Sequence, residues 1–108
     1  MIEFPPPTDG AITQEWSHDH PGYDFACRRG EPIYAVHEGY LTYDYDTRLG
    51  NQAIVHYDGE VTTYSHMDTV YPPGWYGQGD VIGTCGDTGS YSTGPHVHFE
   101  STFVYRFR

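Results

Sequence analysis

The chain has 108 residues, the size of one small domain with a single hydrophobic core. Fifteen acidic residues stand against five arginines and no lysine, which gives a formal net charge of −10. Nucleic acids and anionic lipids attract cationic surfaces, so this charge argues against both as partners. No apolar run approaches the ~20 residues of a membrane-spanning helix, so we expect no membrane insertion.

Short strand-forming segments alternate with turns along the chain. Thirteen glycines and eight prolines interrupt the sequence so often that no long amphipathic helix fits. Between them lie segments rich in Tyr, Val, Ile and Thr, which favour strands. The strands predicted in chain order are Pro32–Val36, Tyr40–Tyr45, Gln52–Tyr57, Glu60–His66, Asp80–Thr84, Pro95–Glu100 and an edge strand at Thr102–Phe107. The pattern predicts one all-β domain over residues 1–108: a lead-in segment (1–9), a core (10–100) and a C-terminal edge segment (101–108).

The dipeptide Asp58-Gly59 is a strong signal for a two-residue hairpin turn. Without a bulge, the register pairs Tyr57 with Glu60, Ala53 with Tyr64 and Asn51 with His66. Directly opposed residues share a face, so we expect Tyr64 and Asn51 on the face that carries His66. The same alternation places His56 on the other face.

Histidines form the main chemical signal, because seven of them exceed the number of arginines. His96 and His98 are two apart in a predicted strand, so their side chains point the same way. His20 and Asp24 are separated by Pro21-Gly22, which argues against a helix, so they must converge through a turn that enters a strand. Each pattern taken singly is also typical of ordinary surface residues.

Three segments carry a family resemblance. They are His20-Pro-Gly-Tyr-Asp24, Tyr64-Ser-His66-Met67 and Gly94-Pro-His96-Val-His98-Phe-Glu100. Their order and spacing resemble the motifs of the lysostaphin-type (LytM-like) zinc metallopeptidases, which cut peptidoglycan cross-bridges. The resemblance runs from about residue 10 to residue 100. It implies a lysostaphin-like peptidase fold, with a small antiparallel sheet core of the barrel-sandwich (duplicated hybrid motif) type.

The resemblance also implies a metal site and a catalytic pair. The zinc ligands would be His20, Asp24 and His98, holding one Zn²⁺ per chain, and the catalytic pair would be His66 and His96. Three protein ligands plus water is the composition of a catalytic zinc site, in which the metal lowers the pKa of water. The sequence has no His-Glu-x-x-His helix to supply a glutamate base. We therefore assign the base to His96 and a hydrogen bond to the developing oxyanion to His66.

Four further residues carry weaker predictions. Asn51 could position the peptide substrate, although a plain turn residue explains it equally well. Tyr64 could do the same, with buried packing as its alternative. Cys27 and Cys85 either form a disulfide, which suits an extracytoplasmic enzyme, or remain two buried thiols.

The predicted function is a monomeric zinc-dependent endopeptidase that hydrolyses amide bonds in peptidoglycan stem peptides or cross-bridges. Such a wall-lytic, endolysin-like or antibacterial enzyme acts outside the cytoplasm, whether secreted, wall-bound or phage-delivered, and the chain shows no signal peptide at its start. Two alternatives stay open. One is a catalytically silent activator of wall hydrolases with the same fold. The other is a phosphocarrier-like domain that transfers a phosphoryl group through histidine.

Overall fold

The computed structural model describes residues 2–103 and 105–107. These residues form β1 (Ile2–Phe4), β2 (Ile12–Gln14), β3 (Tyr23–Ala26), β4 (Pro32–Tyr34), β5 (Gly39–Asp46), β6 (Gly50–Tyr57), β7 (Glu60–Val70), β8 (Gly74–Tyr76), β9 (Val81–Cys85), β10 (His96–Ser101) and β11 (Tyr105–Phe107). No helix occurs in this part of the chain, and hence none long and apolar enough to cross a membrane.

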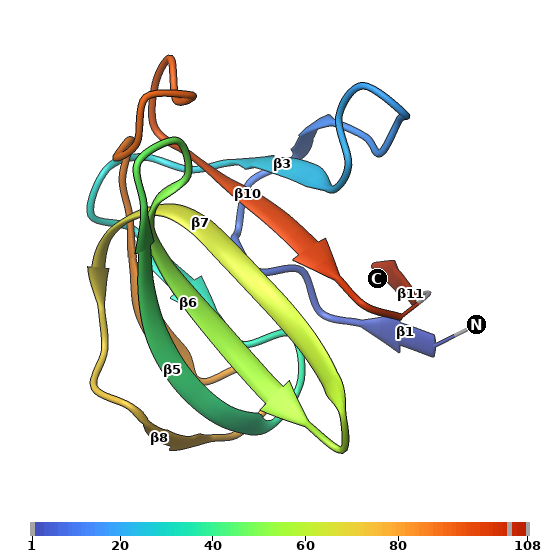
Figure 1. Cartoon of the computed structure of the whole chain (residues 1–108). Helices are drawn as coiled ribbons and strands as arrows, with labels where there is room; N and C mark the ends of the chain where they lie inside the picture. The colour runs from blue at the N-terminus through green and yellow to red at the C-terminus, as the bar shows by residue number, and fades with distance from the viewer. Residues whose placement is uncertain (1, 104, 108) are drawn as a thin grey trace.

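The main sheet is antiparallel and strongly curved (Figure 1). Its strands follow the order β2-β3-β10-β7-β6-β5-β8, and β9 joins it by pairing with both β7 and β4. Strands distant in sequence thus become neighbours, because β10 lies between β3 and β7. This topology places the N-terminal and C-terminal motifs side by side.

Strand β7 changes partner in its middle. Its first part pairs with β10 from Thr62 to Ser65, whereas Met67 and Val70 pair with β9. At this point the β6–β7 register shifts, so that Ser65 and His66 together oppose Gln52. This extra residue is a β-bulge, and His66 within it adopts a positive φ of 63° that non-glycine residues rarely take.

The bulge corrects the predicted register of the hairpin. The pairs Tyr57–Glu60 and Ala53–Tyr64 are confirmed, but Asn51 pairs with Met67 instead of His66. A bulge reverses side-chain alternation beyond it. The predicted placement of Tyr64 on the face of His66 is therefore wrong.

The hydrophobic core takes apolar side chains from most strands. Its residues are Phe25, Ile33, Ala35, Val36, Leu41, Ala53, Val55, Tyr64, Met67, Ile82, Cys85, Val97 and Phe99. Burying this many apolar side chains supplies the main stabilising contribution, at about 25 cal/mol per Å² of apolar surface. Along β6, Ala53 and Val55 belong to the core and His56 is exposed. Gln52 is buried, and its amide donates to the Ser65 hydroxyl at 3.0 Å.

The predicted strands compare closely with the observed ones. The six from Pro32 to Glu100 are all present, and Glu60–His66 extends to Val70. The edge strand predicted at 102–107 is shorter, since it covers Tyr105–Phe107, and residue 104 lies outside the described residues. It pairs in parallel with β1 as a separate two-stranded sheet near both termini.

Three short strands were not predicted: β1, β2 and β8. Each has three residues, too few to show alternation, and exists through pairing with a neighbour. For example, Trp75 of β8 lies opposite Tyr40 of β5. β3 is the strand that the turn after His20 was predicted to enter.

Candidate metal centre and active site

The site begins with two opposed residues on neighbouring strands. His98 of β10 is the register partner of Asp24 of β3, so the two side chains share a face. Nδ1 of His98 lies 3.0 Å from Oδ1 of Asp24. The pairing of β3 with β10 therefore brings together residues 74 positions apart in the sequence.

His20 reaches this pair through the predicted turn into a strand. Its backbone N–H donates to the Ser17 carbonyl, and the Ser17 N–H donates to the His20 carbonyl, which closes the loop. Gly22, at φ 108°, then passes so close to β10 that a Cβ would lie 2.6 Å from the Phe99 carbonyl oxygen. Only glycine fits this approach. Nε2 of His20 lies 3.2 Å from Oδ2 of Asp24.

Glu100 acts on the other ring nitrogen of His98. Its Oε2 lies 3.2 Å from Nε2 of His98, so the ring is held between two carboxylates. Burial lowers the pKa of His98, but the bonds to Asp24 and Glu100 outweigh burial and raise this pKa to about 9. Burial raises the pKa of Asp24, but the His98 bond and the neighbouring imidazoles lower it overall.

The donor set fits a zinc ion. One ligand atom each from His20, Asp24 and His98 lie within 4.8 Å of one another. Two imidazoles and one carboxylate are a common ligand set for catalytic zinc. Nδ1 of His20 is buried and has no hydrogen-bond partner among the described residues, which is costly for a polar atom. The carboxylate of Glu100 behind His98 is the usual support for a metal-bound histidine.

Two further histidines stand beside the metal cluster. The Nδ1–H of His66 donates to the Thr88 carbonyl at 2.7 Å, and the Nδ1–H of His96 donates to the Gly94 carbonyl at 2.8 Å. A carbonyl only accepts, so both neutral rings carry their hydrogen on Nδ1 and leave Nε2 as an acceptor. The ring centroids lie 4.7 Å apart, and Nε2 of His96 is 3.7 Å from Oδ1 of Asp24. Burial lowers the pKa of His66, which favours its neutral form.

The two residues predicted to contact the substrate, Tyr64 and Asn51, differ in their burial. Tyr64 is completely buried, and its hydroxyl accepts from the Val36 N–H, so it cannot touch a substrate. Asn51 is half-buried beside the site; its Oδ1 accepts from the Tyr43 hydroxyl and its Nδ2 donates to the Asp68 carbonyl. Both ends of its amide are thus already paired within the protein.

Of the two alternatives for the cysteines, the structure contains the disulfide Cys27–Cys85. It joins the segment that follows β3 to the end of β9. Gly86, next to Cys85, forms a bridge with His96 at the start of β10. The disulfide therefore fastens together segments that lead to Asp24 and His96.

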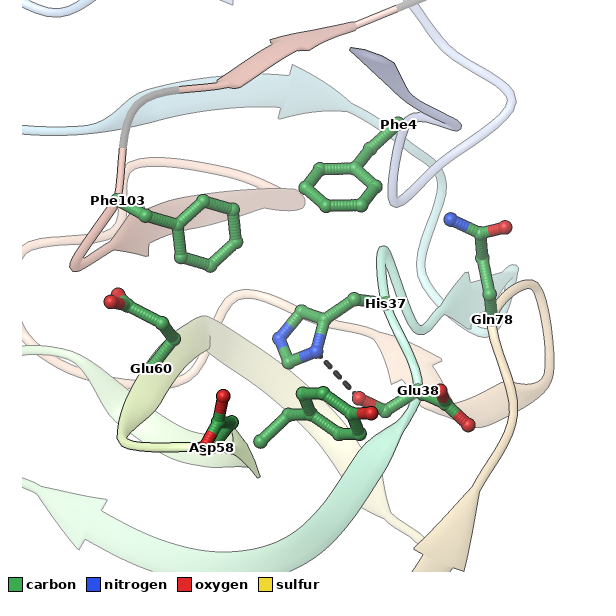
Figure 2. Close-up of a pocket in the computed structure, with 8 residues that line it drawn as sticks. Phe4, His37, Glu38, Asp58, Glu60, Gln78 and Phe103 are labelled. Atoms are coloured by element: carbon green, nitrogen blue, oxygen red, sulfur yellow. Dashed lines mark hydrogen bonds between the residues drawn. The ribbon is translucent and has the colours of Figure 1, made fainter. Parts of the chain in front are cut away.

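Figure 2 shows a cavity of about 530 Å³ whose lining includes none of the three metal-cluster residues. Aromatic and acidic side chains line it, namely Phe4, His37, Glu38, Tyr57, Asp58, Glu60 and Phe103. His37 is buried, with Nδ1 donating to the Glu38 carbonyl at 2.6 Å and Nε2 2.8 Å from the Thr62 hydroxyl. These bonds satisfy the ring internally, so His37 has a structural role here.

Sequence reasoning missed two contributors to the site. Glu100 was part of the motif but received no role, although it lies two residues after His98 and alternation places both on one face. Thr88 gave no signal, because its contacts with His66 depend on how two loops pack in space.

The comparisons with known proteins agree with this geometry. The model of Peptidase family M23 matches residues 18–105. The chain belongs to peptidase family M23. The resemblance seen in the motifs is thereby confirmed, and with it the all-β, lysostaphin-like fold.

Three relatives illustrate the similarity. The DD-carboxypeptidase/endopeptidase Mpg of Neisseria meningitidis is 36% identical over 85 residues, which are 76% of this chain and 20% of that protein. The chain thus spans about a fifth of that relative's length. A zinc-containing peptidase from Vibrio cholerae aligns with a TM-score of 0.82 at 27% identity, covering 91% of this chain and 36% of the other. The catalytic domain of the antimicrobial peptidase lysostaphin from Staphylococcus simulans aligns at 0.67 and 29% identity, covering 94% of this chain and 80% of the other.

Proposed function

We propose that this M23 domain is a zinc-dependent endopeptidase that hydrolyses amide bonds in peptidoglycan stem peptides or cross-bridges. The carrying observation is the convergence of His20, Asp24 and His98 on one metal-sized site beside the paired rings of His66 and His96. Because all five positions are present and meet in space, we favour an active enzyme over a silent activator. Membership of a peptidase family argues against a phosphocarrier.

The metal would be one Zn²⁺ per chain, held by His20, Asp24 and His98. Zinc held there would supply Lewis acidity, which would activate water as a nucleophile and polarise the scissile carbonyl. Glu100 holds the imidazole of His98 with Nδ1 toward the site. A hydrogen bond of this kind to the second ring nitrogen fixes the orientation of a metal-binding imidazole.

His66 and His96 are the two candidates for the proton acceptor. Each neutral ring presents an unprotonated Nε2, so each is able to take the proton of the attacking water. A donor to the oxyanion must instead carry hydrogen on Nε2, which makes it an imidazolium. Burial lowers the pKa of His66 and so disfavours that state for this ring. We therefore revise the assignment made from sequence: His66 accepts the proton and His96 donates to the oxyanion.

We further propose that the domain works as a monomer outside the cytoplasm. A disulfide persists in oxidising compartments, and Cys27–Cys85 supports this placement. The net charge of −10 would not attract the domain to anionic wall polymers, so delivery to the wall would depend on another component.

The test is digestion of purified peptidoglycans of defined cross-bridge, read by mass spectrometry. One substrate carries glycyl–glycine bridges, and the other carries direct D-alanyl–diamino-acid cross-links. The zinc-loaded protein should release new amino termini from at least one of them, and Asp24→Ala from neither. A protein that binds one zinc but cuts no bond in either polymer would contradict the proposal.

A further inference from the structure

Thr88 lies in the loop between β9 and β10 and contacts His66 through its backbone. Its carbonyl oxygen accepts the Nδ1–H of His66 at 2.7 Å. This bond fixes both the ring orientation and the tautomer, because the hydrogen on Nδ1 leaves the lone pair on Nε2. The acceptor atom that the proposed mechanism uses therefore depends on where this one carbonyl lies.

The Thr88 hydroxyl holds that carbonyl in place. It donates to the Met67 carbonyl at 2.6 Å and accepts from the Asn51 backbone N–H at 3.1 Å. Met67 directly follows His66, and Asn51 is the residue of β6 that pairs with Met67. The side chain of Thr88 thus ties its loop to both strands at the bulge that carries His66.

The surrounding backbone is shaped for this contact. A Cβ on Gly50 would lie 2.3 Å from the Thr88 hydroxyl oxygen, and a Cβ on Gly89 would lie 2.4 Å from the Arg48 carbonyl oxygen. Both glycines have a positive φ, so both positions require glycine for the two loops to approach this closely. The backbone N–H groups of Ser90 and Tyr91 then donate to the carbonyls of Thr47 and Arg48, which joins the two loops.

We propose that Thr88 is the positioning residue of His66, acting through its hydroxyl on the bulge and through its carbonyl on the ring. The inference rests on the proposed function only in giving His66 a catalytic role. Loss of the hydroxyl leaves a backbone donor and a backbone acceptor without this partner, so the loop shifts and the hold on Nδ1–H weakens.

The experiment compares Thr88→Val, which removes the hydroxyl at nearly constant shape, with Thr88→Ser, which keeps it. Thr84→Val is the matched control, because its hydroxyl also binds backbone, accepting from the Thr69 N–H at 3.1 Å, but belongs to β9 and does not contact His66. Each zinc-loaded protein is measured for zinc content, for kcat and KM on the peptidoglycan it cuts, and for the ¹⁵N shifts of the His66 ring. If Thr88→Val fails to fold, Thr88→Ala takes its place.

We expect Thr88→Val to retain zinc, to lose about 10- to 100-fold in kcat with little change in KM, and to show mixed His66 tautomers. Thr88→Ser and Thr84→Val should keep the Nδ1–H tautomer and remain near the wild-type rate. An unchanged tautomer and kcat in Thr88→Val would overturn the proposal, and so would equal damage in Thr88→Ser.

The ring shifts separate this inference from the proposed function. A wild-type protein that cuts no peptidoglycan, yet holds the tautomer that Thr88→Val loses, would refute the function and support the positioning. An active wild type, together with a Thr88→Val variant that keeps the Nδ1–H tautomer of His66, would support the function and refute the positioning.

Discussion

Tyr64 and His66 point to opposite faces of β7, although they lie only two residues apart. The Tyr64 ring packs against Phe99 in the core, whereas the His66 ring lies 4.7 Å from that of His96 in the site. In a regular strand the two side chains would share a face. The extra residue at Ser65–His66 reverses the alternation, so the chain fills its core and its active site from one strand.

The histidine pair gives the first prediction. His66→Ala and His96→Ala should each lower kcat/KM by about 100-fold or more, because the first removes the proton acceptor and the second removes the donor to the oxyanion. Zinc content, measured by elemental analysis, should stay at the wild-type level, since neither ring belongs to the three-ligand cluster. Full activity in either variant would remove that residue from the mechanism.

The second prediction concerns the metal site. Asp24→Ala should abolish zinc binding, whereas Glu100→Gln should weaken it by about 10- to 100-fold, because the amide holds the His98 ring less firmly. Titration against a competing chelator measures both effects. Glu60→Gln is the control, since Glu60 is an acid on β7 that accepts from the Thr102 hydroxyl. Equal affinities for Glu100→Gln and Glu60→Gln would show that Glu100 does not support the site.

A third prediction tests the substrate contact expected of Asn51. Asn51→Ala should raise KM several-fold if its amide also meets the substrate. Tyr43→Phe removes the hydroxyl that Asn51 binds but leaves the amide in place, so it should keep the wild-type KM. Unchanged kcat/KM in Asn51→Ala would show that Asn51 does not contact the substrate and only supports neighbouring residues.

The fourth prediction concerns the disulfide, which closes a loop across 58 positions. Chain-entropy arguments give such a link a stabilising effect of ~4 kcal/mol. The double variant Cys27→Ser/Cys85→Ser should therefore lose a large part of the free energy of unfolding, as measured in urea. A reductant should lower the Tm of the wild type and leave the Tm of the double variant unchanged. A wild type insensitive to reductant would contradict the assignment.

The fifth prediction follows from His37. Burial lowers its pKa below the ordinary 6.5, despite the opposing bond to the Glu38 carbonyl. The unfolded chain therefore takes up this proton at a higher pH than the folded one, so the contribution of His37 to the free energy of unfolding falls as pH drops below about 6.5. In zinc-free protein, His37→Gln should lower the free energy of unfolding more near pH 8 than near pH 5. A pH dependence of stability in His37→Gln that runs parallel to that of the wild type would refute the argument.

Much of the architecture was predictable because local chemistry determines it. The Asp58-Gly59 turn set the register of β6 and β7 as far as Tyr64, and turn residues marked the six strands predicted from Pro32 to Glu100. Short strands such as β2 and β8 were not predicted, because they exist only through pairing with neighbours. The motif resemblance named His20, Asp24 and His98, and the structure places them in one cluster.

By itself, the sequence determined the kind of chemistry and the family, since ligand types and motif spacing are written in the order of residues. The tertiary structure alone decided the face on which His66 lies, the disulfide between Cys27 and Cys85, and the place of Thr88 behind the ring. Each of these depends on segments that meet only after folding. A one-residue bulge or a contact between two loops changes no local pattern, yet it determines which atoms come together.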